Sequence, residues 1–252
     1  TSPNSLLNFH LTSRESHAYP LQHNHLASNR LNLQHFLWRE VFNFTIHPSI
    51  HLPSTPPPSI ADIATGTALW LLDVSRLHPS SPLTGLDITL TLAPAPSSLP
   101  RNITLQPWDL FTPIPPSLSN NFDLIHIRLL ILVLSGIDDT LTVLHRLHSL
   151  LRPGGYIQWE EIDVVNMVVR KDDESMPTPA LDALRGVFYA EGRHDWIVEV
   201  GGLRGWLERV GFTGIRVERY CEGRELGRAF GDLHLWTVEE VVGKLEREGK
   251  GD

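Results

Sequence analysis

The sequence predicts an α/β fold built on a doubly wound, mostly parallel β-sheet. Short apolar segments that suit buried strands recur along its 252 residues, separated by helical or loop segments. A turn of small residues joins the first of these strands to a helix, and acidic residues follow the next two strands, where ligands bind in such sheets. We expect one main domain over residues 59–252, preceded by an N-terminal helical segment over residues 1–58.

The N-terminal segment is expected to contain an amphipathic helix over residues 27–46. His35, Trp38 and Phe42 follow one another there at steps of three and four, the period of one helix face. Ser28 is a suitable N-cap, because a serine side chain accepts hydrogen bonds from free N–H groups in the first helical turn. A proline-rich stretch then ends the segment, since proline does not fit a helix interior.

The main domain is expected to open with a strand, a tight turn and a helix. Residues 59–64 are short and apolar, as a buried strand would be, and residues 69–77 form a leucine-rich segment that suits a helix. The turn between them begins at Asp62 and includes Gly66. This order is the opening unit of a parallel sheet.

Further strands are expected where short apolar segments return. We place them at residues 82–87, 102–106, 122–127, 156–159 and 214–219. Leucine spacing predicts a helix over 138–151, which the Arg-Pro-Gly-Gly turn at 152–155 ends. Another helix over 203–210 stops at Gly211, and the charged segment 237–249 is also helix-like.

Composition excludes several classes of partner. The net charge of −8 provides no basic surface for a phosphate backbone, so nucleic acid is not an expected partner. Cys221 is the only cysteine, which excludes an intrachain disulfide and a cysteine-rich zinc site and favours the cytosol. The longest apolar run, residues 129–134, is far shorter than the roughly 18 residues that span a bilayer. We expect neither a membrane anchor nor a metal, because His23 and His25 lack acidic or cysteine companions.

Acidic residues mark the expected carboxyl ends of three strands. Asp62 begins the first turn, and Asp87 lies 21 residues after Gly66, close to the roughly 20-residue offset at which an acid meets a ribose in nucleotide-binding folds. Asp109 follows the third strand beside Trp108, so a carboxylate and an aromatic face are available to an adenine. Together they predict an adenosine site. The alternative is that Asp62 and Asp87 only stabilise loops, since aspartate favours turns.

The sequence resembles class I methyltransferases, which have a Rossmann-like fold and bind S-adenosylmethionine, and in particular their fungal secondary-metabolism branch of regulators and small-molecule methyltransferases. The resemblance covers nearly the whole chain. It rests on RLNLQHFLW at 30–38 with HPSI at 47–50, ADIATGT at 61–67, FDLIHIR at 122–128 and LRPGGYIQWE at 151–160.

The resemblance implies a site for S-adenosylmethionine, with residues 1–58 as a lid and an insertion at about 162–200 covering the substrate. The turn implied to hold the methyl donor includes Asp62, Ala64, Gly66 and Thr67. Asp87 is implied to contact the ribose, Trp108 and Asp109 the adenine, and His126 and Arg128 the methionine end.

Two features depart from the family pattern. The usual turn is Asp-x-Gly-x-Gly-x-Gly, and here Ala64 and Ala68 replace the outer glycines, which restricts how closely the backbone approaches a ligand. The chain also ends without the final antiparallel strand that such folds insert beside the sixth. We therefore expect an exposed sheet edge, open to a protein partner or to a second copy in a homodimer.

Candidate catalytic residues follow the fourth and fifth strands. Methyl transfer mainly requires a nucleophile held in line with an activated methyl group, so a general base is optional. Glu160, Glu161 or His126 is placed to serve as one. The alternative is that one glutamate points to solvent and His126 packs against the cofactor.

Substrate contacts are expected from the lid, the fifth strand and the insertion. The candidates are Tyr19, His35, Trp38, Glu161 and His194. The helical spacing of Trp38 equally suits a core position.

These observations favour a methyltransferase that acts on a small secondary metabolite. Two alternatives stay open at this point. The fold can steer a pericyclic or cyclisation step without methyl transfer, which the Ala68 replacement and the missing strand allow. It can also serve a regulatory protein without catalysis, which would bind through the exposed sheet edge and the acidic tail.

Overall fold

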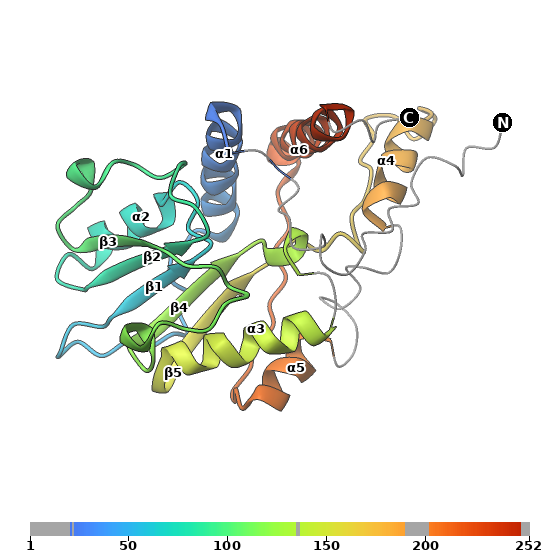
Figure 1. Cartoon of the computed structure of the whole chain (residues 1–252). Helices are drawn as coiled ribbons and strands as arrows, with labels where there is room; N and C mark the ends of the chain where they lie inside the picture. The colour runs from blue at the N-terminus through green and yellow to red at the C-terminus, as the bar shows by residue number, and fades with distance from the viewer. Residues whose placement is uncertain (1–20, 22, 135–136, 190–201, 248–252) are drawn as a thin grey trace.

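The computed structural model describes residues 21, 23–134, 137–189 and 202–247, and these form an α/β fold around one parallel sheet (Figure 1). The strand order is β3-β2-β1-β4-β5, and every strand pair is parallel. The strands are β1 (Ile60–Ile63), β2 (Leu83–Asp87), β3 (Ile103–Pro107), β4 (Phe122–Arg128) and β5 (Leu151–Glu160). The order reverses between β1 and β4, which confirms the predicted doubly wound, class I methyltransferase-like sheet.

Helices cover both faces of the sheet. Helix α2 (Leu69–Leu77) lies on one face, while α3 (Ile137–Leu150) and α5 (Leu203–Val210) lie on the other (Figure 1). Side chains alternate between the faces along each strand, so Ile60 packs in the α2 layer and its neighbour Ala61 in the α3 and α5 layer. Two apolar layers, both in the interior, therefore hold the sheet in place.

The remaining helices lie beyond the carboxyl ends of the strands. Helices α1 (His25–Phe42) and α6 (Gly227–Arg247) lie side by side, with α4 (Pro179–Tyr189) beyond α6 (Figure 1). The 3₁₀ turns are η2 (Pro96–Ser98), η3 (Pro116–Leu118), η4 (Leu130–Leu132) and η6 (Arg224–Leu226). Within the described ranges, no helix combines the length and apolar character needed to cross a membrane.

The predicted boundaries of the first helix are wrong at both ends. Asn24, not Ser28, is the N-cap, and its side-chain oxygen accepts hydrogen bonds from the N–H groups of Leu26 and Ala27, both at 3.0 Å. The helix stops at Phe42 because Asn43 adopts a left-handed conformation, with φ of 56°. Asparagine tolerates that conformation better than most residues, which explains the early stop.

The segment 152–155 is part of β5 and not the predicted turn. Helix α3 ends at Leu150, and β5 begins at the next residue. The pairing with β4 shifts register here, because Phe122 pairs with Leu151 and Leu124 already pairs with Tyr156. The proline and the two glycines form a bulge inside the strand.

The predicted sixth strand at 214–219 is also wrong. This segment belongs to no strand of the described sheet, and Gly214 has a left-handed φ of 64°. Its aromatic neighbour Tyr220 packs against Phe42 and Phe44, with ring centroids 4.7 and 5.8 Å away, while Ile215 packs in the core layer on α3 and α5. Strand β5 is consequently an outer strand of the sheet in the part of the chain that the structure describes.

Candidate functional site

The turn between β1 and α2 uses the left-handed conformation three times. Ala64, Gly66 and Ala68 have φ of 55°, 54° and 58°. Thr65 Oγ1 donates a hydrogen bond to Asp62 Oδ2 at 2.6 Å, which closes the turn onto its first residue. The backbone therefore keeps the shape of a glycine-rich turn although two of the glycines are alanines.

We expect Ala64→Gly to raise the free energy of unfolding by about 0.5–1 kcal/mol, since an L-residue in this conformation is strained by about 1–2 kcal/mol and glycine is not. Part of the gain is offset by the greater freedom of glycine in the unfolded chain. Ala64 is exposed, whereas Ala68 is fully buried, so Ala68→Gly also loses packing and should gain less. Chemical denaturation of both variants measures the difference. A destabilised Ala64→Gly variant would contradict the left-handed turn.

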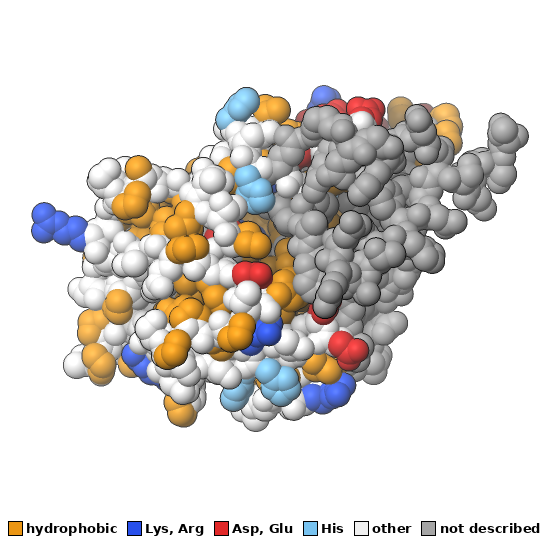
Figure 2. Space-filling model, viewed as in Figure 1, with side chains coloured by type: hydrophobic (Ala, Val, Ile, Leu, Met, Phe, Trp, Pro, Cys, Tyr) orange, Lys and Arg blue, Asp and Glu red, His pale blue; other side chains and the backbone are white. Residues whose placement is uncertain are grey.

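All nine predicted cofactor residues line one cavity of about 320 Å³ at the carboxyl ends of β1, β2 and β4. They are Asp62, Ala64, Gly66, Thr67, Asp87, Trp108, Asp109, His126 and Arg128. The space-filling view shows hydrophobic side chains gathered near the middle of the face turned toward the viewer, with an acidic side chain among them (Figure 2). The structure brings the predicted residues together, and ligand binding by them stays a prediction.

The acidic residues of this cavity also stabilise its loops, as the alternative interpretation expected. Asp87 Oδ2 accepts a hydrogen bond from the N–H of Gly66 at 2.9 Å and clamps the first turn to β2. Asp109 Oδ1 accepts one from the N–H of Phe111 at 2.9 Å. Burial raises the pKa of Asp87, although hydrogen bonds from the N–H groups of Gly66 and Thr89 oppose the rise. Each carboxylate still has acceptor sites to spare, because it offers about four lone pairs.

His126 lies at the centre of a buried cluster. Its Nδ1 is 2.7 Å from Asp62 Oδ1 on the neighbouring strand, and its ring stacks on Trp70 with centroids 3.8 Å apart. Burial alone would lower the pKa of His126, but the carboxylates of Glu160 and Asp62 raise it. A protonated imidazole has no lone pair to accept a proton, so this environment does not suit the predicted role of general base.

Glu160 is committed to charge pairing. Arg128 Nε donates to Glu160 Oε2 at 2.7 Å, and Gln158 Nε2 donates to Oε1 at 2.6 Å. Burial alone would raise the pKa of Glu160, but Arg128 and His126 lower it to about 2. So weakly basic a carboxylate also does not suit the predicted general-base role.

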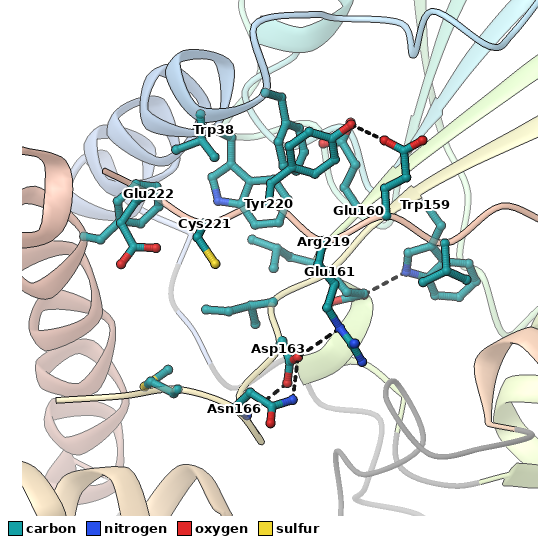
Figure 3. Close-up of a pocket in the computed structure, with 18 of the residues that line it drawn as sticks. Trp38, Trp159, Glu160, Glu161, Asp163, Asn166, Arg219, Tyr220, Cys221 and Glu222 are labelled. Atoms are coloured by element: carbon teal, nitrogen blue, oxygen red, sulfur yellow. Dashed lines mark hydrogen bonds and ion pairs between the residues drawn. The ribbon is translucent and has the colours of Figure 1, made fainter. Parts of the chain in front are cut away.

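Glu161 has the opposite environment. Its Oε1 accepts hydrogen bonds from the N–H of Leu130 at 2.7 Å and from Trp159 Nε1 at 2.9 Å (Figure 3). Its Oε2 is buried and has no hydrogen-bond partner within the part of the chain that the structure describes. Burial raises the pKa of Glu161 to about 7. Of the three predicted candidates, Glu161 alone has a pKa that suits proton transfer near neutral pH.

A second, larger cavity of about 2260 Å³ adjoins the first. Trp38, Glu160 and Glu161 are among its lining residues (Figure 3). The residues that line both cavities are Gln34, Leu129, Ile162, Met167, Leu233 and His234. The two cavities therefore share a wall and can hold two ligands next to each other.

The predicted substrate residues are divided between the two cavities. Trp38 and Glu161 line the larger cavity, while His35 lines the smaller one. Both ring nitrogens of His35 are engaged, because Nδ1 faces Arg128 Nη1 at 3.2 Å and Nε2 faces Asp73 Oδ2 at 3.0 Å. Burial and the nearby Arg128 lower the pKa of His35, which keeps the ring neutral. Tyr19 and His194 lie outside the described residues.

Two important residues were missed at the sequence level. Trp70 supplies the ring under His126, and its Nε1 donates to the carbonyl of Thr45 at 3.1 Å. Arg30 is buried on α1 and lines the smaller cavity. A charged residue at a buried helix position was the available signal for Arg30. For metal binding, the described ranges contain no group of three or more suitable side chains.

Comparison with known proteins confirms the resemblance seen in the sequence. No family model matches. The chain is 36% identical over 143 residues to methyltransferase grgD of a Penicillium species, covering 53% of this chain and 48% of the relative. It is 28% identical over 226 residues to N-methyltransferase sirN of Leptosphaeria maculans, covering 88% and 75%.

Two further similarities are to a curated regulator and to a solved structure. The secondary metabolism regulator LAE1 of Hypocrea atroviridis is 32% identical over 133 residues, covering 52% of this chain and 36% of that protein. A solved S-adenosylmethionine-dependent methyltransferase from Mesorhizobium loti has a TM-score of 0.49 at 24% identity, covering 72% of this chain and 86% of that one. The chain spans about half the length of the first curated relatives it matches.

Proposed function

We propose that this chain, a relative of fungal secondary-metabolism methyltransferases, binds S-adenosylmethionine and methylates a small-molecule acceptor. The observation that carries the proposal is the convergence of nine residues, predicted from strand ends and motif, on one cavity beside a larger one. The smaller cavity lies within the range of about 300–1,000 Å³ typical of ligand sites. The N-methyltransferase names of several relatives make a nitrogen acceptor our first choice.

The smaller cavity fits an adenosine. Asp87 and Asp109 retain acceptor sites for ribose hydroxyls and an adenine amino group, and the buried Trp108 provides an apolar ring face. The turn that ends at Ala68 forms part of the wall of this cavity. S-adenosylmethionine would supply an already activated methyl group, so the protein mainly needs to align the acceptor and exclude water.

The larger cavity is proposed to hold the acceptor. Glu161 would take a proton from the acceptor, since the N–H of Leu130 and Trp159 Nε1 hold its Oε1 in place. The charged cluster of His126, Glu160 and Arg128 would form a rigid side wall where the two cavities meet, and leave donor and acceptor in direct contact. In this proposal Glu161 is the catalytic residue, and Leu130 and Trp159 position it.

We expect Asp87→Asn to weaken binding of S-adenosylmethionine by about 10- to 100-fold, since a hydrogen bond to a charged group is lost. Asparagine keeps an oxygen for the N–H of Gly66, so the turn should survive. Titration calorimetry of a folded sample measures the affinity. Asp123→Asn is the matched control, because Asp123 lies at the amino end of β4, away from the cavity. Unchanged affinity in Asp87→Asn would refute the ribose assignment.

The activity itself is tested by product mass. Incubation with S-adenosylmethionine and host extracts should yield a metabolite heavier by one CH₂ unit. Absence of binding to the wild-type chain would refute the proposed function. A product of unchanged formula would favour the cyclisation alternative.

We also propose a cytosolic location and an interaction at the sheet edge. The single cysteine supports a cytosolic location. The unpaired outer edge of β5 supports a second copy or a protein partner there. Sedimentation of the purified chain tests for a homodimer.

A further inference from the structure

Arg30 is a buried cation that the proposed mechanism leaves unused. It lies on α1, is 2% exposed and lines the smaller cavity. Its Nε donates to Glu240 Oε2 of α6 at 2.7 Å, and both side chains in this pair are almost fully buried. Its Nη2 is buried as well but has no hydrogen-bond partner among the described residues.

An unpaired donor on a buried guanidinium is unfavourable, because the group has lost its water without a replacement. A guanidinium offers donors on several sides, and Glu240 occupies only one of them. The group that best completes such a site is an anion with planar oxygens, since carboxylates match the spacing of guanidinium N–H groups. The free Nη2 therefore indicates an anionic ligand group in the cavity.

The position of Arg30 on α1 narrows the choice of anion. The segment from His23 to His35, which includes the first turns of α1, lines the smaller cavity, and His35 at its far end contacts Arg128. The neighbouring Leu31 Cδ1 lies 3.4 Å from the point where a Cβ on Gly66 would be. Arg30 thus lies beside the first turn, between the proposed ribose site and the methionine end.

We propose that Arg30 binds the carboxylate of the amino-acid moiety of S-adenosylmethionine through Nη2. The inference rests on the proposed function, and the choice follows from chemistry: this carboxylate is the only anionic group of that molecule. Because Glu240 holds the same guanidinium, the ligand and helix α6 share one residue. Leu233 and Thr237 of α6 line the cavity too, so this helix becomes part of the cofactor site.

The test compares two ligands that differ only in the carboxylate. S-adenosylhomocysteine carries it, and its decarboxylated form, S-adenosyl-3-thiopropylamine, retains the amine and the adenosine. By calorimetry, the wild-type chain should prefer the first ligand by about 10- to 100-fold. In Arg30→Gln the preference should fall to about threefold or less, while Arg30→Lys should keep part of it, since lysine retains the charge without the planar donors.

Glu240→Gln separates ligand contact from helix packing. This variant weakens the link between α1 and α6 but leaves Arg30 in place, so the preference for the carboxylate should persist. Equal weakening of both ligands by Arg30→Gln would overturn the inference and leave Arg30 a structural residue. If the wild-type chain bound neither ligand, the proposed function and this inference would both be overturned. That outcome is distinct from equal weakening in Arg30→Gln, which overturns this inference alone.

Discussion

Glu161→Gln is expected to lower kcat by about 10²- to 10⁴-fold, the usual contribution of a positioned general base. Glutamine keeps an oxygen for the N–H of Leu130 and for Trp159 Nε1, so the local structure should persist. In the wild-type chain kcat should rise with pH through about 7, the pKa to which burial raises Glu161. In the variant this rise should disappear, which single-turnover rates measured from pH 5 to 9 would reveal.

The same variant should be more stable than the wild-type chain at alkaline pH. Because the folded-state pKa of Glu161 lies above its ordinary value of 4.5, the folded chain binds more protons than the unfolded chain between pH 4.5 and 7. The contribution of Glu161 to stability is therefore greatest below pH 4.5 and falls as pH rises to 7, in total by a free energy of unfolding on the order of 3 kcal/mol. Glu161→Gln removes this loss and should be the more stable protein at pH 8.

An exposed carboxylate provides the control for Glu161. Glu208 on α5 also lines the larger cavity, but its side chain is 55% exposed and it pairs with Arg204. Glu208→Gln should change the free energy of unfolding by less than about 0.5 kcal/mol and leave the pH profile in place. If Glu161→Gln retained wild-type kcat, methyl transfer here would proceed without this base.

The elements that the sequence predicted well are those whose pattern depends on local burial. The range predicted for α2 agrees with the structure, and the strand beginning at Phe122 lies within one residue of the predicted range. The nine cofactor residues converge because the carboxyl ends of parallel strands meet at one sheet edge. The expected strand ends were enough to group Asp62, Asp87 and Asp109, whereas Arg128 was implied by the resemblance to class I methyltransferases.

The errors arise where contacts between distant segments decide the outcome. Ile215 and Val217 alternate as in a strand, but a strand needs backbone pairing, and in the described sheet this segment pairs with no strand although Ile215 packs against the core. The link between Arg30 and Glu240 spans 210 residues and has no local signal. The sequence also gives no sign that the neighbouring residues Glu160 and Glu161 have pKa shifts of opposite sign, because their spacing does not reveal which groups surround each carboxylate.

The charged cluster between the cavities should be the most sensitive part of the fold. Arg128→Met is expected to lower the free energy of unfolding by about 3–5 kcal/mol at pH 7, because Glu160 is left buried without its main counter-ion. Methionine retains most of the apolar length that packs near Trp38, whose ring centroid lies 5.2 Å from the guanidinium. Urea denaturation monitored by tryptophan fluorescence measures the loss.

Two comparisons identify the cause of that loss. Arg152→Met removes a guanidinium from the pair with Asp123, where the arginine side chain is 41% exposed, and should cost less than about 1 kcal/mol. The double variant Arg128→Met with Glu160→Gln should recover part of the stability, since no uncompensated carboxylate is left. Equal losses in the two arginine variants would refute a special role for burial.

The pH dependence of the Arg128→Met variant gives an independent test of the same cluster. In the wild-type chain the pKa of Glu160 is lowered to about 2, so its contribution to stability is complete above pH 4.5 and is lost as pH falls toward 2. Without Arg128, that pKa should rise, because burial is then opposed chiefly by His126, and the carboxyl would take up its proton at a higher pH than in the wild-type chain. The stability difference between the two proteins should therefore be smaller at pH 4 than at pH 7. A difference that stays constant would show that Arg128 stabilises the fold through packing, and the wall between the cavities would then not depend on charge.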